Sequence, residues 1–229
     1  MNPGSIIPFL RSVGAIFLKD WRSELRTRYA ISALLMFVVT TIAIILFSLG
    51  SDGAPADALS GMLWVVIFFA AMSGLSRTFV MEEERGTTLT LQLLAPASAV
   101  FFGKLLFNLV LVLGLNAVTV LLYAAFINGF IIRSVPIFLC TVLLGSMGFA
   151  AAATVIAAII ARANTKGTLY PVLSFPILLP LLLTVINATR LASEGAFFRE
   201  ALGEFQILIS YIVVVVVTSY LLIEYIWKD

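Results

Sequence analysis

The chain has 229 residues, 62% of them hydrophobic and 11% charged, with a net charge of +2 and a mean hydropathy of +1.12. So much apolar surface excludes a soluble globular domain, and so small a net charge gives no sign of a nucleic-acid partner. The sequence contains no histidine, and its one cysteine, Cys140, has no internal partner for a disulfide. The composition therefore indicates a membrane protein.

The first 28 residues combine apolar and basic residues at helical spacing. Because polar residues interrupt the apolar ones, they do not resemble a signal peptide. A helix of this kind lies in the membrane interface, with its apolar face in the acyl boundary and its basic residues near the headgroups. We expect a cytoplasmic or interfacial elbow helix over residues 1–28, and a solvated basic extension is the alternative. The residues that define the elbow are Phe17, Lys19, Trp21, Arg22 and Arg26.

Six long apolar runs follow the elbow and occupy most of the chain. Each is close to the roughly 20 residues that a helix needs to cross the hydrocarbon layer, and none has the short alternating pattern of a membrane barrel. The sequence therefore predicts an all-α integral membrane protein with one domain over residues 1–229 and a six-helix membrane part at 29–227. The expected spans are Tyr29–Leu49, Leu59–Val80, Phe101–Ile127, Pro136–Ala161, Leu169–Ala188 and Phe205–Trp227.

Lysine and arginine gather on one side of these predicted spans. With the N-terminus inside, only three of the 14 basic residues fall on the outer side: Arg133, Arg190 and Arg199. Short loops rich in basic residues stay in the cytoplasm. We therefore expect a multi-pass protein with both termini in the cytoplasm.

The centres of the predicted spans carry no ionisable carboxylate or amine, and Lys104 lies toward a cytoplasmic end, from which a long side chain can reach the interface. A proton relay or an ion-coupled carrier needs ionisable groups inside. The chain also has no phosphate-binding loop, so energy for transport would come from a partner ATPase. Ser146 has no histidine to act as its base, and its neighbours Gly145 and Gly148 indicate close helix packing instead of catalysis.

The loop between the second and third predicted spans, residues 81–96, has the most specific pattern. Three successive glutamates lie where positive charge otherwise gathers, Gly86 permits a sharp turn, and Pro96 discourages a longer helix. We predict a short leucine-rich helix parallel to the membrane and held in the groove of a partner. An equally supported alternative packs the leucines on the protein's own helices, and their alternation with polar residues leaves the helix itself open.

Residues Glu82–Lys104, with the pattern E-x-E-R-G-T followed by G-K, resemble the signature of six-span ABC-2 (type V exporter-like) permeases. Within that group the chain is most similar to the haem exporter protein B (CcmB) family of the cytochrome c maturation system, and residues 18–28 and 173–182 extend the similarity. The resemblance implies a permease-like subunit, not itself an enzyme. ATP hydrolysis by a partner would be coupled to transfer or release of haem on a periplasmic chaperone.

The resemblance also implies where the partner ATPase would act. Its closure would push on residues 86–96 and tilt spans two and three, with a second contact in the loop at 162–167. The residues expected to couple to the ATPase are Glu82, Glu83, Glu84, Arg85, Gly86, Thr87, Leu89, Leu93, Pro96, Asn164 and Lys166. No catalytic residue and no metal site are predicted.

The resemblance implies a location in a bacterial inner membrane and several partners. They are a cytoplasmic CcmA-like ABC ATPase, a second copy of this chain, CcmC-like and CcmD-like haem-handling subunits, a CcmE-like periplasmic chaperone and the lipid bilayer. No cofactor is assigned to this chain: haem belongs to the complex, and ATP with Mg²⁺ to the partner. Without histidine, the haem ligands left are Met, Tyr and Cys140, which are poorer ones.

Two other functions remain open, a generic ABC-2 exporter of a glycan, lipid or drug and a non-transporting assembly scaffold.

Two further patterns bear on mechanism. Prolines at 171, 176 and 180 predict a kink in the fifth span. The outer segment Asn187–Glu204 is either an ordinary interfacial loop, which we favour, or a short amphipathic helix that docks a partner, with Arg190 and Arg199 binding carboxylates.

Overall fold

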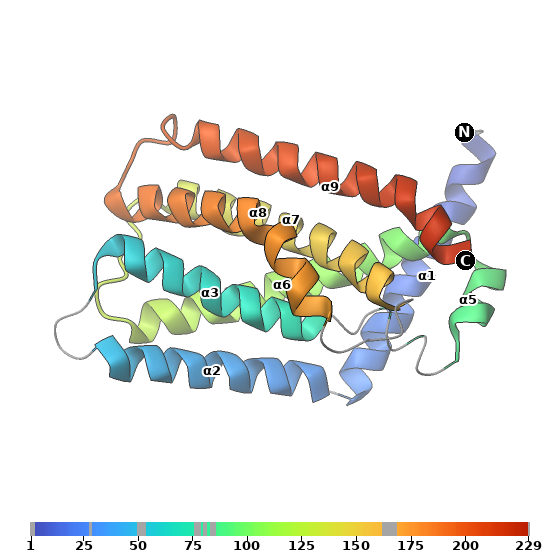
Figure 1. Cartoon of the computed structure of the whole chain (residues 1–229), viewed down its shortest axis with the longest axis horizontal. Coiled ribbons are helices and arrows are strands. Elements are labelled where there is room, and N and C mark those ends of the chain that lie inside the picture. Colours follow the sequence, from blue (N-terminus) through green and yellow to red (C-terminus); the bar gives the residue numbers. More distant parts are fainter. Residues whose placement is uncertain are drawn as a thin grey trace.

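A computed structural model describes residues 3–27, 29–49, 54–75, 79, 82, 86–161 and 169–228 of the chain. Within these residues the structure is helical and contains no strand. The helices, labelled as in Figure 1, are α1 (Pro3–Thr27), α2 (Tyr29–Leu49), α3 (Ala56–Leu75), α5 (Thr88–Leu94), α6 (Ala97–Phe126), α7 (Val135–Ala161), α8 (Leu169–Glu194) and α9 (Leu202–Lys228). Six of them are long and apolar enough to cross a membrane: α2, α3, α6, α7, α8 and α9. The predicted all-α, six-span membrane fold is confirmed.

The first and fourth spans match the expected boundaries to within one residue. The second begins at Ala56, three residues earlier than expected, and α3 ends at Leu75. The third span begins earlier than expected, at Ala97, because Pro96 starts the helix from an extended conformation with ψ +149°. The fifth runs past Ala188 to Glu194, and Gly195, at φ +82°, ends it. The Ala196 amide then donates to the Leu191 carbonyl (3.0 Å), a glycine-type helix end. The outer segment therefore forms no separate helix: its first part continues α8, and the sixth span begins at Leu202.

The six spans lie alongside one another, with α2 and α9 on opposite sides of the bundle (Figure 1). Helix α7 is central: it packs mainly on α8, α9 and α6, whereas α3 packs on α8, α2 and α6. Most residues of α7 and α3 are buried, whereas few residues of α2 and α9 are. Because the exposed side chains of these outer helices are largely apolar, they suit contact with lipid.

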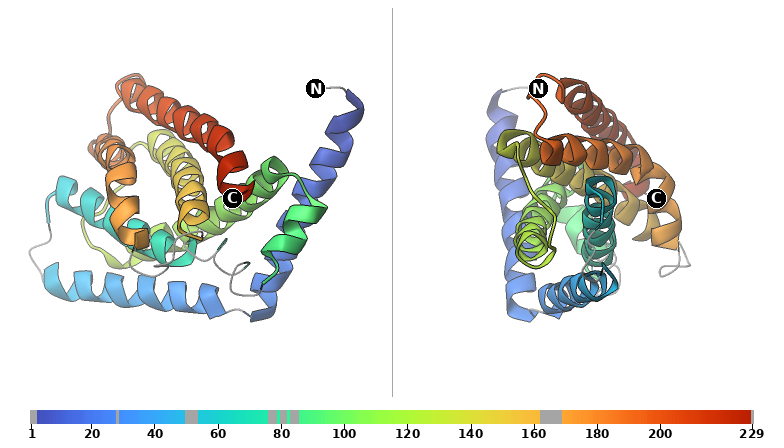
Figure 2. Two further views of the ribbon diagram at one scale, coloured as in Figure 1. Left: turned by 45° about the vertical axis from the view of Figure 1, so that its right-hand side comes forward. Right: turned by 90° about the vertical axis from the view of Figure 1, so that its left-hand side faces the viewer.

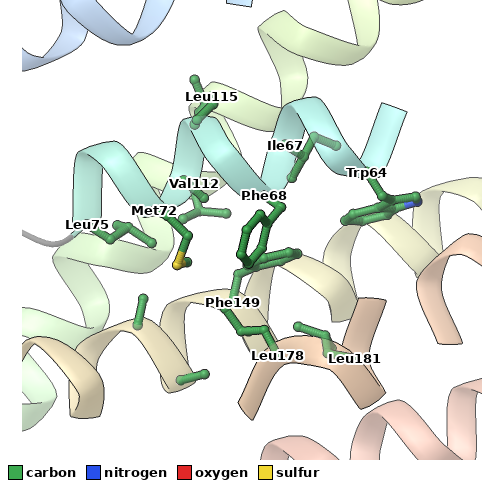
Figure 3. Close-up of a cluster of buried hydrophobic side chains, with 14 of the residues drawn as sticks. Trp64, Ile67, Phe68, Met72, Leu75, Val112, Leu115, Phe149, Leu178 and Leu181 are labelled. Atoms are coloured by element: carbon green, nitrogen blue, oxygen red, sulfur yellow. The ribbon is translucent and has the colours of Figure 1, made fainter. Parts of the chain in front are cut away.

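The core forms where aromatic side chains of α3 meet glycines of α7. The Trp64 and Phe149 rings stack at 6.1 Å, and Figure 3 shows Phe68 beside them with Leu181 of α8 close by. A Cβ added at Gly145 would lie 2.7 Å from the Trp64 ring, and one at Gly148 would lie 2.6 Å from Leu181. The packing interpretation of this small-residue run is confirmed.

Two buried hydrogen bonds join α6 to α7. The side-chain amide of Asn108 donates to the Thr154 hydroxyl, and that of Asn116 donates to the Ser146 hydroxyl, each at 2.8 Å. The Ser146 hydroxyl itself donates to the Val142 carbonyl (2.6 Å). Polar pairs of this kind stabilise helix association in lipid, so Ser146 holds helices together.

One end of the bundle carries α1, α5 and both ends of the chain (Figure 1). Helix α1 runs across the spans instead of along them, as Figure 2 shows, and it packs chiefly on α6 with a smaller contact to α2. The expected helix over the first 28 residues is therefore present, although its place in the interface stays a prediction. Figure 1 also shows α8 bent along its length, and Pro176 and Pro180 lie inside it.

Candidate functional site

Helix α5 is a single short helix set between two breaks. Before it, Gly86 adopts φ +65°, a left-handed conformation that glycine takes without strain. After it, Ala95 is extended and Pro96 starts α6. The alternation of leucines with polar residues left open whether this segment is helical, and the structure shows that it is a helix. The turn at Gly86 and the break at Ala95 and Pro96 therefore limit α5 to seven residues and separate it from α6.

The leucines of α5 divide into one that packs inward and three that face outward. Leu91 packs against the core, whereas Leu89, Leu93 and Leu94 are 73%, 88% and 77% exposed. Positions 89 and 93 are one helical turn apart and share a face. Three neighbouring large apolar side chains at such exposure mark an interaction surface. The alternative that packs the leucines on this chain's own helices thus holds for Leu91 and not for the other three, and a partner for the exposed face stays a prediction.

Glu82 points the other way, into the protein. Its carboxylate is nearly buried and contacts Lys104 (Nζ to Oε1, 3.3 Å) and Lys19. The Thr87 hydroxyl donates to its other oxygen at 2.6 Å. The charge of Glu82 is therefore already satisfied by this chain.

Charged neighbours change the acidity of Glu82. Burial alone would raise the pKa of its carboxyl, but the Lys104 charge and the hydrogen bonds from Lys19 and Thr87 lower that pKa from 4.5 to about 2. The pKa of Lys19 is raised: its burial acts to lower the pKa, and the charges of Asp20 and Glu82 outweigh it. Glu82 is thus ionised and Lys19 charged at neutral pH.

Lys104 lies near the start of α6, and its side chain is fully buried, with Nζ 3.3 Å from Asp20 of α1 and 5.1 Å from the centre of the Phe79 ring. A charged amine can be buried when it is paired in this way. The sequence did not predict this pairing, because the acidic partners of Lys104 come from two other segments. Its expected position near the interface stays a prediction.

Gly103, next to Lys104, sets the distance between α1 and α6. A Cβ at this position would lie 2.8 Å from Ile16 and 3.1 Å from the Val13 carbonyl oxygen. Nearby, the Phe9 ring meets the Phe102 ring edge-on at 6.3 Å. The Gly-Lys pair that carries the family resemblance therefore docks α1, with glycine giving the close approach and lysine the charge.

Among the remaining elbow residues, Phe17 and Trp21 are half-buried and the two arginines, Arg22 and Arg26, are exposed. The Phe17 and Trp21 rings stack at 6.1 Å, and the apolar Leu18 is exposed as well. One helix thus has a face packed on α6, an exposed apolar side and a basic side. This arrangement supports the predicted interfacial position.

Part of the predicted site lies outside the described residues: Glu83, Glu84, Arg85, Asn164 and Lys166. Asp20 is a residue that the prediction missed. It sits on the face of α1 with Val13 and Ile16, where the helical period alone predicts an apolar side chain. An acidic residue at an otherwise apolar position of the helical pattern is the signal that could have identified Asp20.

At the opposite end of the bundle, Arg190 is already engaged. Its guanidinium donates to Asn187 Oδ1 (3.0 and 3.2 Å) and lies 3.4 Å from Glu194 and 3.8 Å from Asp57. Arg199 is exposed in the turn before α9. Of the two predicted carboxylate-binding arginines, only Arg199 extends from the protein.

These features define a class: a six-span helical membrane permease with an elbow helix and a short helix exposed at the same end. The chain belongs to the CcmB family, whose model, described as CcmB protein, matches residues 11–223. No curated protein matches it significantly. Membership and the six apolar spans support a membrane permease subunit of haem export in cytochrome c maturation, in an ABC-type complex with an ATPase partner.

Proposed function

We propose that this chain couples ATP hydrolysis by a cytoplasmic ABC ATPase to transfer or release of haem on a periplasmic chaperone. In this proposal the ATPase holds α5. The observation that carries it is the outward face of α5, where Leu89, Leu93 and Leu94 are exposed beside a turn fixed by Gly86.

A partner groove explains this exposure better than water does. Burying a leucine side chain contributes about 1.5–3 kcal/mol, and a helix as short as α5 is not stable without tertiary contacts. Short amphipathic helices recognised in grooves present apolar residues one turn apart, as positions 89 and 93 do. Leu91 keeps α5 attached to this chain while its other face is free to bind.

The short connection between α5 and α6 would transmit a movement of the bound α5 to the span. Only Ala95 and Pro96 separate α5 from the long span that begins at Ala97. A displacement of α5 therefore reaches the cytoplasmic end of α6 directly, and tilting of α3 and α6 is the expected response. The distribution of basic residues in the sequence supports a cytoplasmic position for this end and for both termini.

Haem is cargo of the complex in this proposal. The chain has no histidine, so its Met, Tyr and Cys140 side chains would be the haem ligands left, and they are poorer ones. This composition favours a force-transmitting role over a haem-ligating one. Haem-handling membrane subunits and a second copy of the chain would complete the complex.

The test compares Leu93→Asp with Phe197→Asp. Phe197 is also strongly exposed but lies in the turn between α8 and α9, at the opposite end of the bundle. Each tagged variant is purified from its native membrane, and the ATPase that comes with it is quantified by mass spectrometry. We expect Leu93→Asp to lose the ATPase and Phe197→Asp to keep it.

Equal recovery of the ATPase by both variants would contradict the role of α5. An absorption spectrum and the identity of the other co-purified proteins test the substrate. Recovery of the ATPase without any haem-handling subunit would favour a generic exporter of a glycan, lipid or drug.

A further inference from the structure

We infer that a closed ring of four charged side chains positions α5 and carries its movement into α6. This charge ring consists of Lys19, Asp20, Glu82 and Lys104. The inference rests on the proposed function, because it names the positioning residues of the same site. Three segments meet in the charge ring: α1, the loop before α5, which contributes Glu82, and α6.

Each lysine of the charge ring contacts both carboxylates. Lys104 Nζ lies 3.3 Å from Asp20 Oδ2 and 3.3 Å from Glu82 Oε1. Lys19 Nζ lies 3.2 Å from Asp20 Oδ1 and also contacts Glu82 Oε1. Positive and negative groups therefore alternate around the ring, and its charge sums to zero.

Burial makes the charge ring sensitive to loss of one member. The side chain of Lys104 is 0% exposed, those of Asp20 and Glu82 are 11% and 10%, and only Lys19, at 44%, reaches solvent. Removing one member of a buried ion network leaves an uncompensated charge, whereas removing an opposite pair does not. This difference permits a test that separates charge balance from positioning.

On one side, the charge ring is tied to the start of α5. The Thr87 amide donates to the Glu82 carbonyl at 3.0 Å, and the Thr87 hydroxyl donates to the Glu82 carboxylate. Thr87 immediately precedes α5, and its hydroxyl makes no capping bond to that helix. The side chain that would ordinarily cap α5 is instead bound to the charge ring.

On the other side, the charge ring is tied to the buried bundle. Lys104 and Asn108 lie one turn apart on the same face of α6, and Asn108 donates to Thr154 of α7. The connection therefore leads from Thr87 through Glu82 to Lys104 by direct contacts, then along one turn of α6 to Asn108, which contacts α7. A path of contacts shows coupling only when changing it changes the output, so the experiment measures output.

The test compares Lys104→Met with the double variant Glu82→Gln/Lys104→Met. The single variant leaves a buried excess negative charge, and we expect less assembled complex. The double variant keeps a balanced Lys19–Asp20 pair, so complex recovery should return to within about twofold of wild type. Mature cytochrome c should nevertheless fall about tenfold while ATP hydrolysis continues, because coupling of this size is lost with the link. Arg11→Met, an exposed cation of α1 outside the charge ring, is the matched control.

A second readout is independent of transport. Spin labels at Thr90→Cys on α5 and Leu18→Cys on α1, both exposed, are placed in a Cys140→Ser background of the full chain. We expect one narrow distance distribution with the charge ring intact and a broad one in the double variant.

Each outcome decides a separate claim. An unchanged distance distribution in the double variant would overturn the inference, and so would full cytochrome c maturation by that variant. Maturation unaffected by Leu93→Asp would overturn the proposed function instead. Loss of maturation with a broadened distribution and a recovered complex supports the inference.

Discussion

Charged side chains cluster at both ends of the bundle, and the two clusters differ in burial. The charge ring at the α1 end has side chains that are 0% to 11% exposed except for Lys19. The outer cluster of Asp57, Arg190 and Glu194 has side chains that are 69%, 37% and 47% exposed. The same kind of ion pair thus holds three segments together at one end and is solvated at the other. Burial decides which of them stabilises the fold and positions a helix.

The largest expected effect comes from Lys104→Met. Breaking one buried partner should lower the free energy of unfolding by about 3–5 kcal/mol, whereas Arg190→Met in the outer cluster should cost about 1 kcal/mol or less. Denaturant unfolding of both variants in the same detergent checks this contrast. Equal losses of unfolding free energy in the two variants would mean that burial does not decide how much each cluster contributes to stability.

A smaller effect is expected where Gly103 brings α1 to α6. In Gly103→Ala the new methyl group meets Ile16 and the Val13 carbonyl oxygen, so overpacking should cost about 1–3 kcal/mol and loosen α1. Gly114→Ala on the same helix is the control, since a Cβ there has nothing within 4 Å. Protease cleavage within α1 is the measurement. Faster cleavage in both variants, or in neither, would show that close approach at Gly103 does not hold α1.

The pH dependence of stability sharpens the comparison further. The folded-state pKa of Glu82 is lowered to about 2 from 4.5, so its contribution is present above pH 4.5 and is lost as pH falls toward 2. The raised pKa of Lys19 keeps its contribution below pH 10.5 and removes it as pH rises through the higher folded value. The stability difference between wild type and Glu82→Gln should be constant from pH 5 to 8 and shrink in acid, as measured by thermal unfolding. A difference that already shrinks between pH 8 and 6 would contradict the assigned environment of Glu82.

The smallest effect is expected in the outer cluster. Asp57→Asn removes a partner 3.8 Å from Arg190 on a largely exposed side chain. Its effect on the free energy of unfolding should stay below about 1 kcal/mol and disappear in high salt. A larger loss that persists in salt would assign this end a structural role like that of the charge ring.

Sequence patterns predicted the fold because lipid imposes a simple rule on long segments. Six apolar runs and an interrupted basic helix gave the spans and α1, and Gly86 with Pro96 delimited α5. Backbone conformation at a turn and the length of an apolar run both depend on neighbouring residues, so these elements could be predicted from the sequence. The kink of the fifth span followed from its prolines for the same reason.

The charge ring could not be predicted from the sequence in this way. Lys104 lies 84 positions from Asp20 and 22 from Glu82, and no local period links them. Glu82, Glu83 and Glu84 look equivalent in the sequence, yet Glu82 faces two lysines inside the protein. The inward turn of Leu91 between two exposed leucines likewise depends on how α5 docks. Tertiary packing, which single-sequence patterns do not contain, decided these features.

The most direct test of the account is the amount of ATPase that co-purifies with Leu93→Asp relative to Phe197→Asp. If α5 is the helix that the ATPase holds, Leu93→Asp should retain less than about a tenth of the wild-type ATPase, since one lost hot-spot contact of 2 kcal/mol or more has that effect. Phe197→Asp should retain the wild-type amount. Undiminished ATPase with Leu93→Asp would show that the exposed face of α5 is not the coupling surface.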